Sequence, residues 1–116
     1  MGVNIIDSYQ FGRIVVNGKK YTSDVIIFPY TVNGNWWRKT GHELCLEDIT
    51  TIIAEFPEVL VIGTGASGLM KVLLDVQEAA QARHIKLIVE ATDKACNTYN
   101  QLCHYQRVVA ALHIAC

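Results

Sequence analysis

The chain is poor in net charge, in proline and in apolar stretches of membrane length, and each shortage rules out a class of protein. It has 10 Lys and Arg residues against 11 Asp and Glu residues, and this net charge of −1 lacks the positive field that non-specific nucleic-acid binding needs. Two prolines and no glycine repeat exclude collagen-like and linker-like chains. With 51% hydrophobic and 18% charged residues, the 116-residue chain is predicted to fold, as one domain over residues 1–116.

The compartment is predicted from targeting signals that the sequence does not contain. No apolar run approaches the ~20 residues of a membrane span. Residues 1–7 lack the basic-then-apolar order of a secretory signal. Ile6 stands where a myristoylation signal has serine or threonine. The four cysteines form no Cys-x-x-Cys pair, so we expect a cytoplasmic protein with reduced thiols and no membrane insertion.

Strand signals dominate the first 40 residues. Asn17-Gly18 lies between two short strand-like runs and predicts a β-hairpin, because both central residues of such a turn need positive φ. Residues 25–28 form a continuous apolar run, which is typical of a strand buried on both faces. A second Asn-Gly pair, Asn33-Gly34, predicts another hairpin within residues 30–38.

Helices and strands are predicted to alternate in the second half. The three predicted helices carry an apolar stripe and cover residues 46–56, 69–83 and 92–103. The three predicted strands are short apolar runs at residues 59–62, 85–89 and 107–114. Strands joined through helices pair in parallel. The expected fold class is therefore α/β with three layers: a β-rich N-terminal half with hairpins, followed by a β-α-β-α-β parallel unit, with about three main helices.

Residues 63–68 read Gly-Thr-Gly-Ala-Ser-Gly directly after a predicted strand, as in a dinucleotide-binding loop. In such loops the glycines let the backbone approach a pyrophosphate at a helix N-terminus. An acid at the end of the next strand is placed to bind a ribose. The candidate cofactor-binding residues, all at the carboxyl ends of predicted parallel strands, are Gly63, Thr64, Gly65, Ser67, Glu90 and Thr92.

The alternative is a tight turn whose glycines serve the backbone alone. The chain is short for a dinucleotide fold with a substrate domain, and residues 69–74 also read as a strand or loop, so that the helix would begin near Asp75. In that case Gly63 or Gly65 is expected to have positive φ, or to pack against backbone too closely for a side chain.

No catalytic or metal-binding set of residues is assigned from the sequence. The four histidines, which match no zinc spacing, are His42, His84, His104 and His113. His113 and Cys116 are spaced as His-x-x-Cys, and Cys96 falls on an apolar stripe, where thiols are usually inert. We interpret these groups as buried thiols and surface imidazoles, and expect no metal and no cofactor. Whether the protein is an enzyme stays open, with the sequence favouring a non-enzyme.

Trp36-Trp37-Arg38-Lys39 places aromatic and cationic side chains side by side. Such a segment stacks on bases or anchors a protein partner. Neighbouring residues of a strand point to opposite faces, so one tryptophan is expected in the core and the other on the surface. A single basic pair favours packing and a protein partner over nucleic acid, and the candidate interaction residues are Trp36, Trp37, Arg38 and His42.

Two spaced motifs give the chain a family resemblance. The first is Trp-Arg-x-x-Gly-His at residues 37–42 with Pro-Glu-Val-Leu-Val-Ile-Gly-Thr-Gly at residues 57–65. The second is Ala-Cys-x-Thr-Tyr-Asn-x-Leu at residues 95–102 with Arg-Val-Val-Ala-Ala-Leu at residues 107–112. From about residue 7 to residue 116, the chain resembles a domain-of-unknown-function family that includes mitochondrial complex I assembly factor 3 and the adipogenesis-associated domain-containing protein.

The resemblance implies a compact three-layer α/β domain, no established enzymatic activity, and a role in association. The second motif also singles out Tyr99, Asn100 and Arg107. We interpret them as a structural clamp: a core tyrosine ring whose hydroxyl finds a partner, an amide bonded to backbone near the helix end, and an arginine bonded to the last carbonyls of the helix.

The predicted function is a non-catalytic protein-interaction or assembly-factor-like module with a protein partner, and a homo-oligomer is one arrangement this allows. The alternative is a small-ligand or nucleotide-binding domain that uses the Gly63–Gly68 turn.

Overall fold

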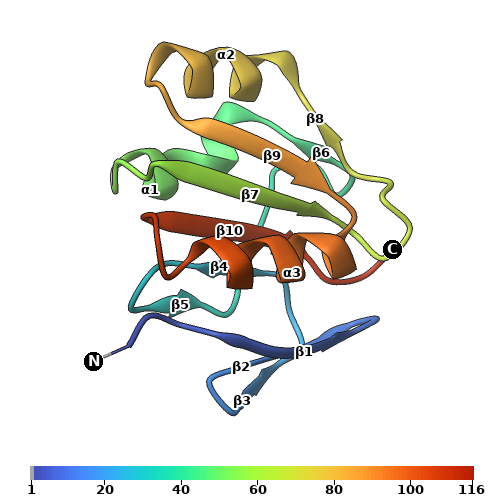
Figure 1. Ribbon diagram of the computed structural model, residues 1–116. Helices are drawn as coiled ribbons and strands as arrows, with labels where there is room; N and C mark the ends of the chain where they lie inside the picture. Colours follow the sequence, from blue (N-terminus) through green and yellow to red (C-terminus); the bar gives the residue numbers. More distant parts are fainter. Residues whose placement is uncertain (1) are drawn as a thin grey trace.

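The structure, a computed structural model that describes residues 2–116, is built around a five-stranded mixed sheet (Figure 1). In sheet order the strands are β5 (Val32–Asn33), β4 (Val25–Ile27), β10 (Val108–His113), β7 (Val59–Thr64) and β9 (Lys86–Glu90). Strands β10, β7 and β9 pair in parallel, whereas β4 is antiparallel to both of its neighbours. The carboxyl ends of the three parallel strands therefore lie at one edge of the sheet.

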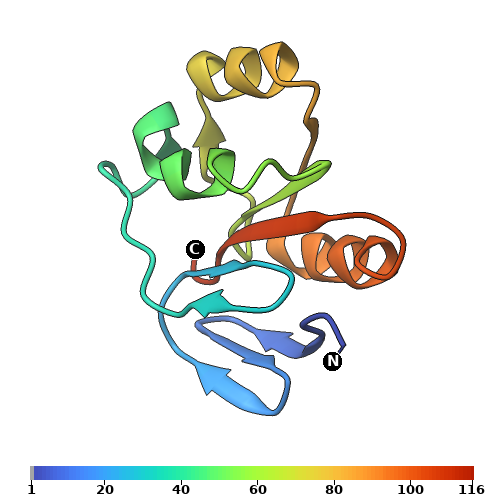
Figure 2. The same ribbon diagram turned by 90° about the vertical axis from the view of Figure 1, so that its left-hand side faces the viewer.

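Two smaller sheets and the helices cover the central sheet. The antiparallel sheet comprises β1 (Ile6–Gln10), β2 (Arg13–Val16) and β3 (Lys19–Tyr21), and a parallel pair comprises β6 (Glu43–Leu44) and β8 (Lys71–Val72). The helices are the 3₁₀ turn η1 (Leu46–Ile49), α1 (Thr50–Ile53), α2 (Leu74–Ala82) and α3 (Thr92–Leu102). Figure 2 shows α1 and α2 on one side of the central sheet, with α3 and the β1–β3 sheet on the other.

Each central strand supplies side chains to two hydrophobic cores. Along β7, Val59 and Val61 face the core shared with α3 and the β1–β3 sheet. Leu60 and Ile62 face the core shared with η1, α1 and α2. Because both faces of the sheet are covered, the central strands are continuous apolar runs rather than alternating ones.

The predicted α/β class and its parallel unit are confirmed. The order β7, α2, β9, α3, β10 reproduces the expected strand–helix–strand–helix–strand sequence. The Asn17-Gly18 hairpin also forms, with φ of 49° at Asn17 and 78° at Gly18, and it joins β2 to β3. Helix α3 lies where the sequence predicts it, with Ala95, Cys96 and Tyr99 buried.

One local prediction is wrong in position, and for a second the structure decides between two alternatives. The second hairpin joins β4 to β5 through residues 28–31, where the Phe28 amide donates to the Thr31 carbonyl at 2.9 Å, and not through Asn33-Gly34. Pro29 explains the shift, because its fixed φ suits a turn and it has no amide to give to a ladder. The helix predicted over residues 69–83 begins at Leu74, because residues 71–72 form β8, and the alternative of a later helix start near Asp75 is thereby confirmed.

The helix predicted over residues 46–56 is also much shorter than expected. It forms as η1 followed by four residues of α1. The β-branched run of residues 50–53 has weak helix propensity, and Phe56 takes a positive φ of 49° before Pro57. The strand predicted at residues 85–89 forms as β9 at an edge of the sheet, so Ile88, which a central parallel strand would bury completely, is only partly buried.

Within residues 2–116, no helix combines the length and the apolar character that crossing a membrane requires.

Truncation of Val61 to alanine is expected to lower the free energy of unfolding by about 2–3 kcal/mol, through lost burial and the cavity left behind. Val61 is 0% exposed at the centre of β7. Val89, which is 45% exposed on β9, is the matched control, and Val89→Ala should change stability by less than about 0.5 kcal/mol. Urea denaturation of the two variants checks this, and equal losses would contradict the assignment of β7 as a central strand.

Candidate functional site

The candidate site lies where β7, β9 and β10 end, and segments from distant parts of the chain meet there (Figure 1). The turn after β7 and the segment after β10 are in contact, since the Ala66 amide donates to the Ala115 carbonyl at 3.4 Å. The β1–β2 turn reaches the same place, since the Gly12 amide donates to the Ile114 carbonyl at 2.7 Å. The candidate cofactor-binding residues and the candidate interaction residues predicted from the sequence both contribute to this edge.

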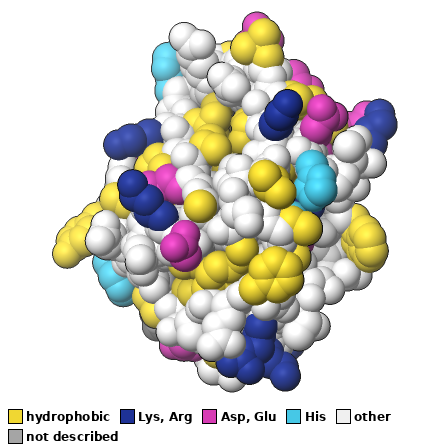
Figure 3. Space-filling view, turned by 90° about the vertical axis from the view of Figure 1, so that its right-hand side faces the viewer, with side chains coloured by type: hydrophobic (Ala, Val, Ile, Leu, Met, Phe, Trp, Pro, Cys, Tyr) yellow, Lys and Arg dark blue, Asp and Glu magenta, His cyan; other side chains and the backbone are white. Residues whose placement is uncertain are grey.

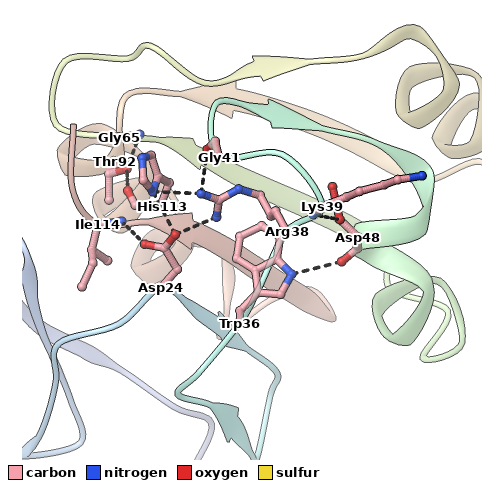
Figure 4. A network of polar contacts seen from close by, with 10 residues as sticks. All are labelled: Asp24, Trp36, Arg38, Lys39, Gly41, Asp48, Gly65, Thr92, His113 and Ile114. Atoms are coloured by element: carbon pink, nitrogen blue, oxygen red, sulfur yellow. Dashed lines mark hydrogen bonds and ion pairs between the residues drawn. The ribbon is translucent and has the colours of Figure 1, made fainter.

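Asp24, directly before β4, is the centre of a buried polar cluster at this edge (Figure 4). Its Oδ2 accepts from Arg38 Nη1 at 2.7 Å and lies 2.9 Å from His113 Nδ1. Its Oδ1 accepts from the Ile114 amide at 2.8 Å. The Arg38 and Asp24 side chains are only 5% and 15% exposed, so this is a buried ion pair with extra hydrogen bonds.

These contacts set the charge state of Asp24. Burial by itself raises the pKa of this carboxyl, but hydrogen bonds from Ile114, Arg38 and His113 outweigh the burial and hold the pKa below its ordinary value. Asp24 is therefore a carboxylate committed to structure, not a proton donor.

Arg38 fixes the conformation of the loop that carries the tryptophans. Its Nη2 donates to the Gly41 carbonyl at 2.9 Å, and its guanidinium lies 4.9 Å from the centre of the Trp36 ring. The Trp36 indole nitrogen donates to the Asp48 carbonyl at 3.0 Å. Trp36 is 6% exposed and Trp37 is 79% exposed, which confirms that one tryptophan is core and the other is surface.

The glycine turn packs against the protein's own backbone. Gly65 has a φ of +108°, and a Cβ atom there would lie 2.7 Å from the carbonyl oxygens of both Ala115 and Cys116. A Cβ atom on Gly63 would lie 2.8 Å from Leu112 Cδ2 and from Thr92 Oγ1. The predicted requirement for glycine at this turn is confirmed.

Thr92 bonds the turn to the end of β10. The Gly65 amide donates to Thr92 Oγ1 at 2.8 Å, and this hydroxyl donates to the His113 carbonyl at 2.6 Å. No helix starts directly after Gly68, because α2 begins at Leu74. This geometry supports the interpretation of the turn as a backbone feature, and its cofactor-binding role stays a prediction.

The remaining cofactor candidates lie around the same turn. Thr64 Oγ1 donates to the Glu90 carbonyl at 3.1 Å. The Glu90 carboxylate accepts from Thr98 Oγ1 at 2.6 Å and lies 3.7 Å from Lys94 Nζ, so α3 holds it. Ser67 is exposed.

His113 and Asp24 are the site residues that the sequence interpretation missed. His113 is 7% exposed, so its interpretation as a surface imidazole is wrong: the ring is enclosed by the segments that meet at this edge. His42 is exposed on its loop, with its ring centre 6.2 Å from that of His113 in an edge-to-face arrangement. Two weak signals exist in the sequence: a lone acid before the apolar run 25–28, and a lone polar residue in the apolar last strand.

The predicted clamp residues are structural, with partly different partners. The Tyr99 hydroxyl donates to the Asn4 carbonyl at 2.8 Å, which confirms the prediction for Tyr99. Asn100 pairs with both backbone groups of Ile6, at 3.0 Å and 2.8 Å, and so joins α3 to β1 instead of capping the helix.

Arg107 likewise does not reach the carbonyls at the end of α3. Its Nε donates to the Phe56 carbonyl at 2.9 Å, and Nη2 contacts the same oxygen. Its backbone amide donates to Glu58 Oε1 at 2.7 Å. The residue therefore joins the start of β10 to the segment before β7, because these two strands are neighbours in the sheet.

The thiols of α3 belong to the core. Burial raises the pKa of Cys96 to about 12, and the negative charge of Asp93 adds to the effect. Burial also raises the pKa of Cys103. Both thiols are therefore neutral and unreactive at physiological pH.

A cleft of about 410 Å³ opens beside the polar cluster. Its walls include Asp24, Trp36, Trp37, Arg38 and His113. The ion pair neutralises the buried wall, and the exposed Trp37 ring adds an apolar surface. An exposed apolar ring beside a neutralised ion pair suits binding by contact better than proton transfer.

The fold and this edge define a class of three-layer α/β protein in which a buried ion pair ties a tryptophan-bearing loop to the ends of parallel strands. The chain belongs to the family described as protein of unknown function (DUF498/DUF598), whose model matches residues 6–114. The family resemblance seen in the sequence is thereby confirmed.

Curated relatives and solved structures agree with this membership. NADH dehydrogenase [ubiquinone] 1 alpha subcomplex assembly factor 3 of Homo sapiens is 30% identical over 109 residues, which is 91% of this chain and 58% of that protein. The Bos taurus protein of the same name is 32% identical over 108 residues, with the same coverage. The chain thus spans less than two-thirds of the length of these relatives.

Two crystal structures share the fold. A conserved hypothetical protein from Pyrococcus horikoshii OT3 superposes with a TM-score of 0.83 at 23% identity, covering 96% of this chain and 98% of that one. A protein from Bartonella henselae, described as an outer membrane protein, superposes with a TM-score of 0.84 at 26% identity, covering 98% and 97%.

Proposed function

We propose that this protein is a non-catalytic interaction module with an assembly-factor role, and that it binds a protein partner through the loops at the carboxyl edge of its parallel strands. The observation that carries the proposal is the exposed Trp37 ring, held between the buried Trp36 and the buried Arg38–Asp24 ion pair. An aromatic side chain on a fixed backbone gives up little conformational entropy on binding, and tryptophan is enriched at binding hot spots.

Two more apolar side chains accompany Trp37 on loops of this edge. Phe11 is 68% exposed and Leu69 is 57% exposed. Their neighbours anchor them, because the Gly12 amide bonds to the Ile114 carbonyl at 2.7 Å and the Met70 amide to the Thr64 carbonyl at 3.0 Å. Figure 3 views this side of the molecule, and hydrophobic side chains spread over its middle and lower part among charged and histidine side chains. An apolar centre with a polar rim is the usual anatomy of a protein interface.

The relatives support the same class of role. The curated relatives are named as assembly factors, and assembly is carried out through contacts with other proteins. The near-neutral charge favours a protein over a nucleic acid as the partner. All four cysteines are free, which supports the cytoplasm or another reducing compartment as the location.

The proposal is tested by Trp37→Ala, with Tyr105→Ala as the matched control. Both rings are well exposed, at 79% and 86%, but Tyr105 lies in the turn before β10, at the opposite end of the parallel strands. Neither change should alter the melting temperature. Affinity-tagged wild-type and variant proteins are expressed in the native host, and the proteins that copurify are quantified; light scattering on the purified chain reports self-association.

A partner, or a second copy of the chain, should bind the wild type and Tyr105→Ala equally well. Trp37→Ala should weaken that binding by at least about 30-fold, which corresponds to a hot spot of about 2 kcal/mol. Equal binding by Trp37→Ala, or an equal loss in Tyr105→Ala, would overturn the proposed docking surface.

A further inference from the structure

We propose that His42, His113 and Cys116 form a zinc-binding site at the carboxyl edge of the parallel strands. One ring nitrogen of each histidine and the Cys116 sulfur lie within 4.8 Å of one another. The three residues come from the loop before β6, the end of β10 and the segment after it. The folded edge thus brings together a ligand set that the spacing of histidines along the sequence does not suggest.

His113 is a buried residue with one ring nitrogen available to bind a metal ion. It is 7% exposed, yet its Nε2 has no hydrogen-bond partner among residues 2–116. A buried polar atom without a partner is costly and calls for an explanation. A metal ion bound at Nε2 gives that atom its missing partner.

The contacts of the other ring nitrogen of His113, Nδ1, determine the tautomer and therefore whether Nε2 has a lone pair. Nδ1 lies 2.9 Å from Asp24 Oδ2, which is a carboxylate oxygen and can only accept. Arg38 Nη2 is also 3.2 Å from Nδ1, but it already donates to the Gly41 carbonyl at the shorter distance of 2.9 Å. The proton therefore lies on Nδ1 and is donated to Asp24, which leaves a lone pair on Nε2.

A carboxylate that holds the far nitrogen of a histidine is the usual second-shell arrangement around a bound metal. It fixes the ring orientation and the tautomer, and it makes the ligating nitrogen more basic. Asp24 has this position relative to His113. Because Arg38 neutralises Asp24, the remaining charge needed by a dication comes from the Cys116 thiolate, whose proton passes to solvent on binding.

Two imidazoles and one thiolate suit Zn²⁺, with a fourth position open to water or a partner's side chain. The ligand atoms of a tetrahedral zinc site are about 3.5 Å apart. The three ligand atoms here lie within 4.8 Å of one another, so they must approach one another by roughly 1 Å to bind the ion. His42 is exposed on a loop, and its side chain is free to make that movement. The bound ion would tie the loop that carries Trp37 to the end of β10.

Metal titration of the full, tag-free chain tests the site, with Co²⁺ as the spectroscopic probe and Zn²⁺ as the competitor. We expect one Co²⁺ per chain, with a thiolate-to-cobalt charge-transfer band and the visible bands of a tetrahedral ion. Zn²⁺ should displace the cobalt, raise the melting temperature, and protect Cys116 from alkylation.

Single substitutions of the proposed ligands distinguish a specific metal site from adventitious metal binding. His42→Ala and Cys116→Ser both change accessible positions, and each should weaken Co²⁺ binding by more than about 10-fold. His104→Ala, another exposed histidine, is the matched control and should bind as the wild type does. Cobalt spectra without a thiolate band, or equal affinity in His42→Ala and the wild type, would overturn the site. Neither result bears on the Trp37 surface, because the comparison of Trp37→Ala with Tyr105→Ala does not measure metal binding.

Discussion

Asp24→Ala is expected to lower the free energy of unfolding at pH 7 by about 3–5 kcal/mol, because it leaves a buried cation without its partner. The Arg38 side chain is 5% exposed and would keep its hydrogen bond to the Gly41 carbonyl and its contact with the Trp36 ring, but no carboxylate to balance its charge. The Ile114 amide and His113 Nδ1 would lose their acceptor as well. Urea denaturation measures the loss. Glu47→Ala, which removes an exposed ion pair of 3.9 Å with Lys39, is the control and should cost less than about 1 kcal/mol.

The same ion pair predicts how stability depends on pH. The pKa of Asp24 is lower in the folded protein than its ordinary value of 3.8, so the unfolded chain binds the proton more tightly. The stabilisation is complete above about pH 4 and is lost as the pH falls through the lower, folded pKa. As the pH falls from 5 to below the folded pKa of Asp24, the free energy of unfolding of Asp24→Asn should therefore decrease less than that of the wild type. Parallel acid profiles would contradict this assignment.

The parts of the fold that the sequence predicts best are those in which local preference and burial agree. Residues 59–62 and 108–112 are continuous apolar runs, and both become central strands buried on two faces. The stripe of Ala95, Cys96 and Tyr99 gives α3. At Asn17-Gly18 the turn chemistry alone decides the hairpin, because few other residues accept two consecutive positive φ angles.

The parts predicted poorly are those in which a distant segment overrides a local pattern. Residues 71–72 lie within an apolar stripe of helical spacing, but they pair with β6, and α2 starts after them. At the second Asn-Gly pair, the nearby Pro29 provides a competing turn that the structure uses instead. Neither outcome follows from propensity summed over a short window.

The polar cluster was also not predicted, because its residues come from distant parts of the sequence. Asp24 and His113 are 89 positions apart in the sequence. They meet because β4 pairs with β10, with Leu112 opposite Val25. Trp36, Trp37, Arg38 and His42 were identified from composition and motif, but the acid that organises them is visible only once the order of the strands is known.

Gly65→Ala is expected to cost about 4 kcal/mol of folding free energy, without any ligand present. Part of the cost is strain, because an alanine at a φ of +108° is penalised by about 1–3 kcal/mol. The rest comes from overpacking, since the new Cβ atom would lie 2.7 Å from the carbonyl oxygens of Ala115 and Cys116. Relieving that contact requires the turn or the segment after β10 to move, and such a movement strains the bonds that Thr92 Oγ1 makes to the Gly65 amide and the His113 carbonyl.

Substitutions of two other glycines distinguish the backbone strain from the overpacking. Gly68 also has a positive φ, of +69°, but the atom nearest to an added Cβ would be Thr64 Oγ1 at 3.6 Å. Gly68→Ala should therefore cost only the backbone strain, about 1 kcal/mol. At Gly41 no described atom lies within 4 Å of an added Cβ, and Gly41→Ala should leave stability nearly unchanged. Thermal and urea denaturation of the three variants should rank them in that order. If Gly65→Ala is no less stable than Gly68→Ala, the turn does not need its close approach to the C-terminal segment, and its glycines would then be better explained by contact with a ligand.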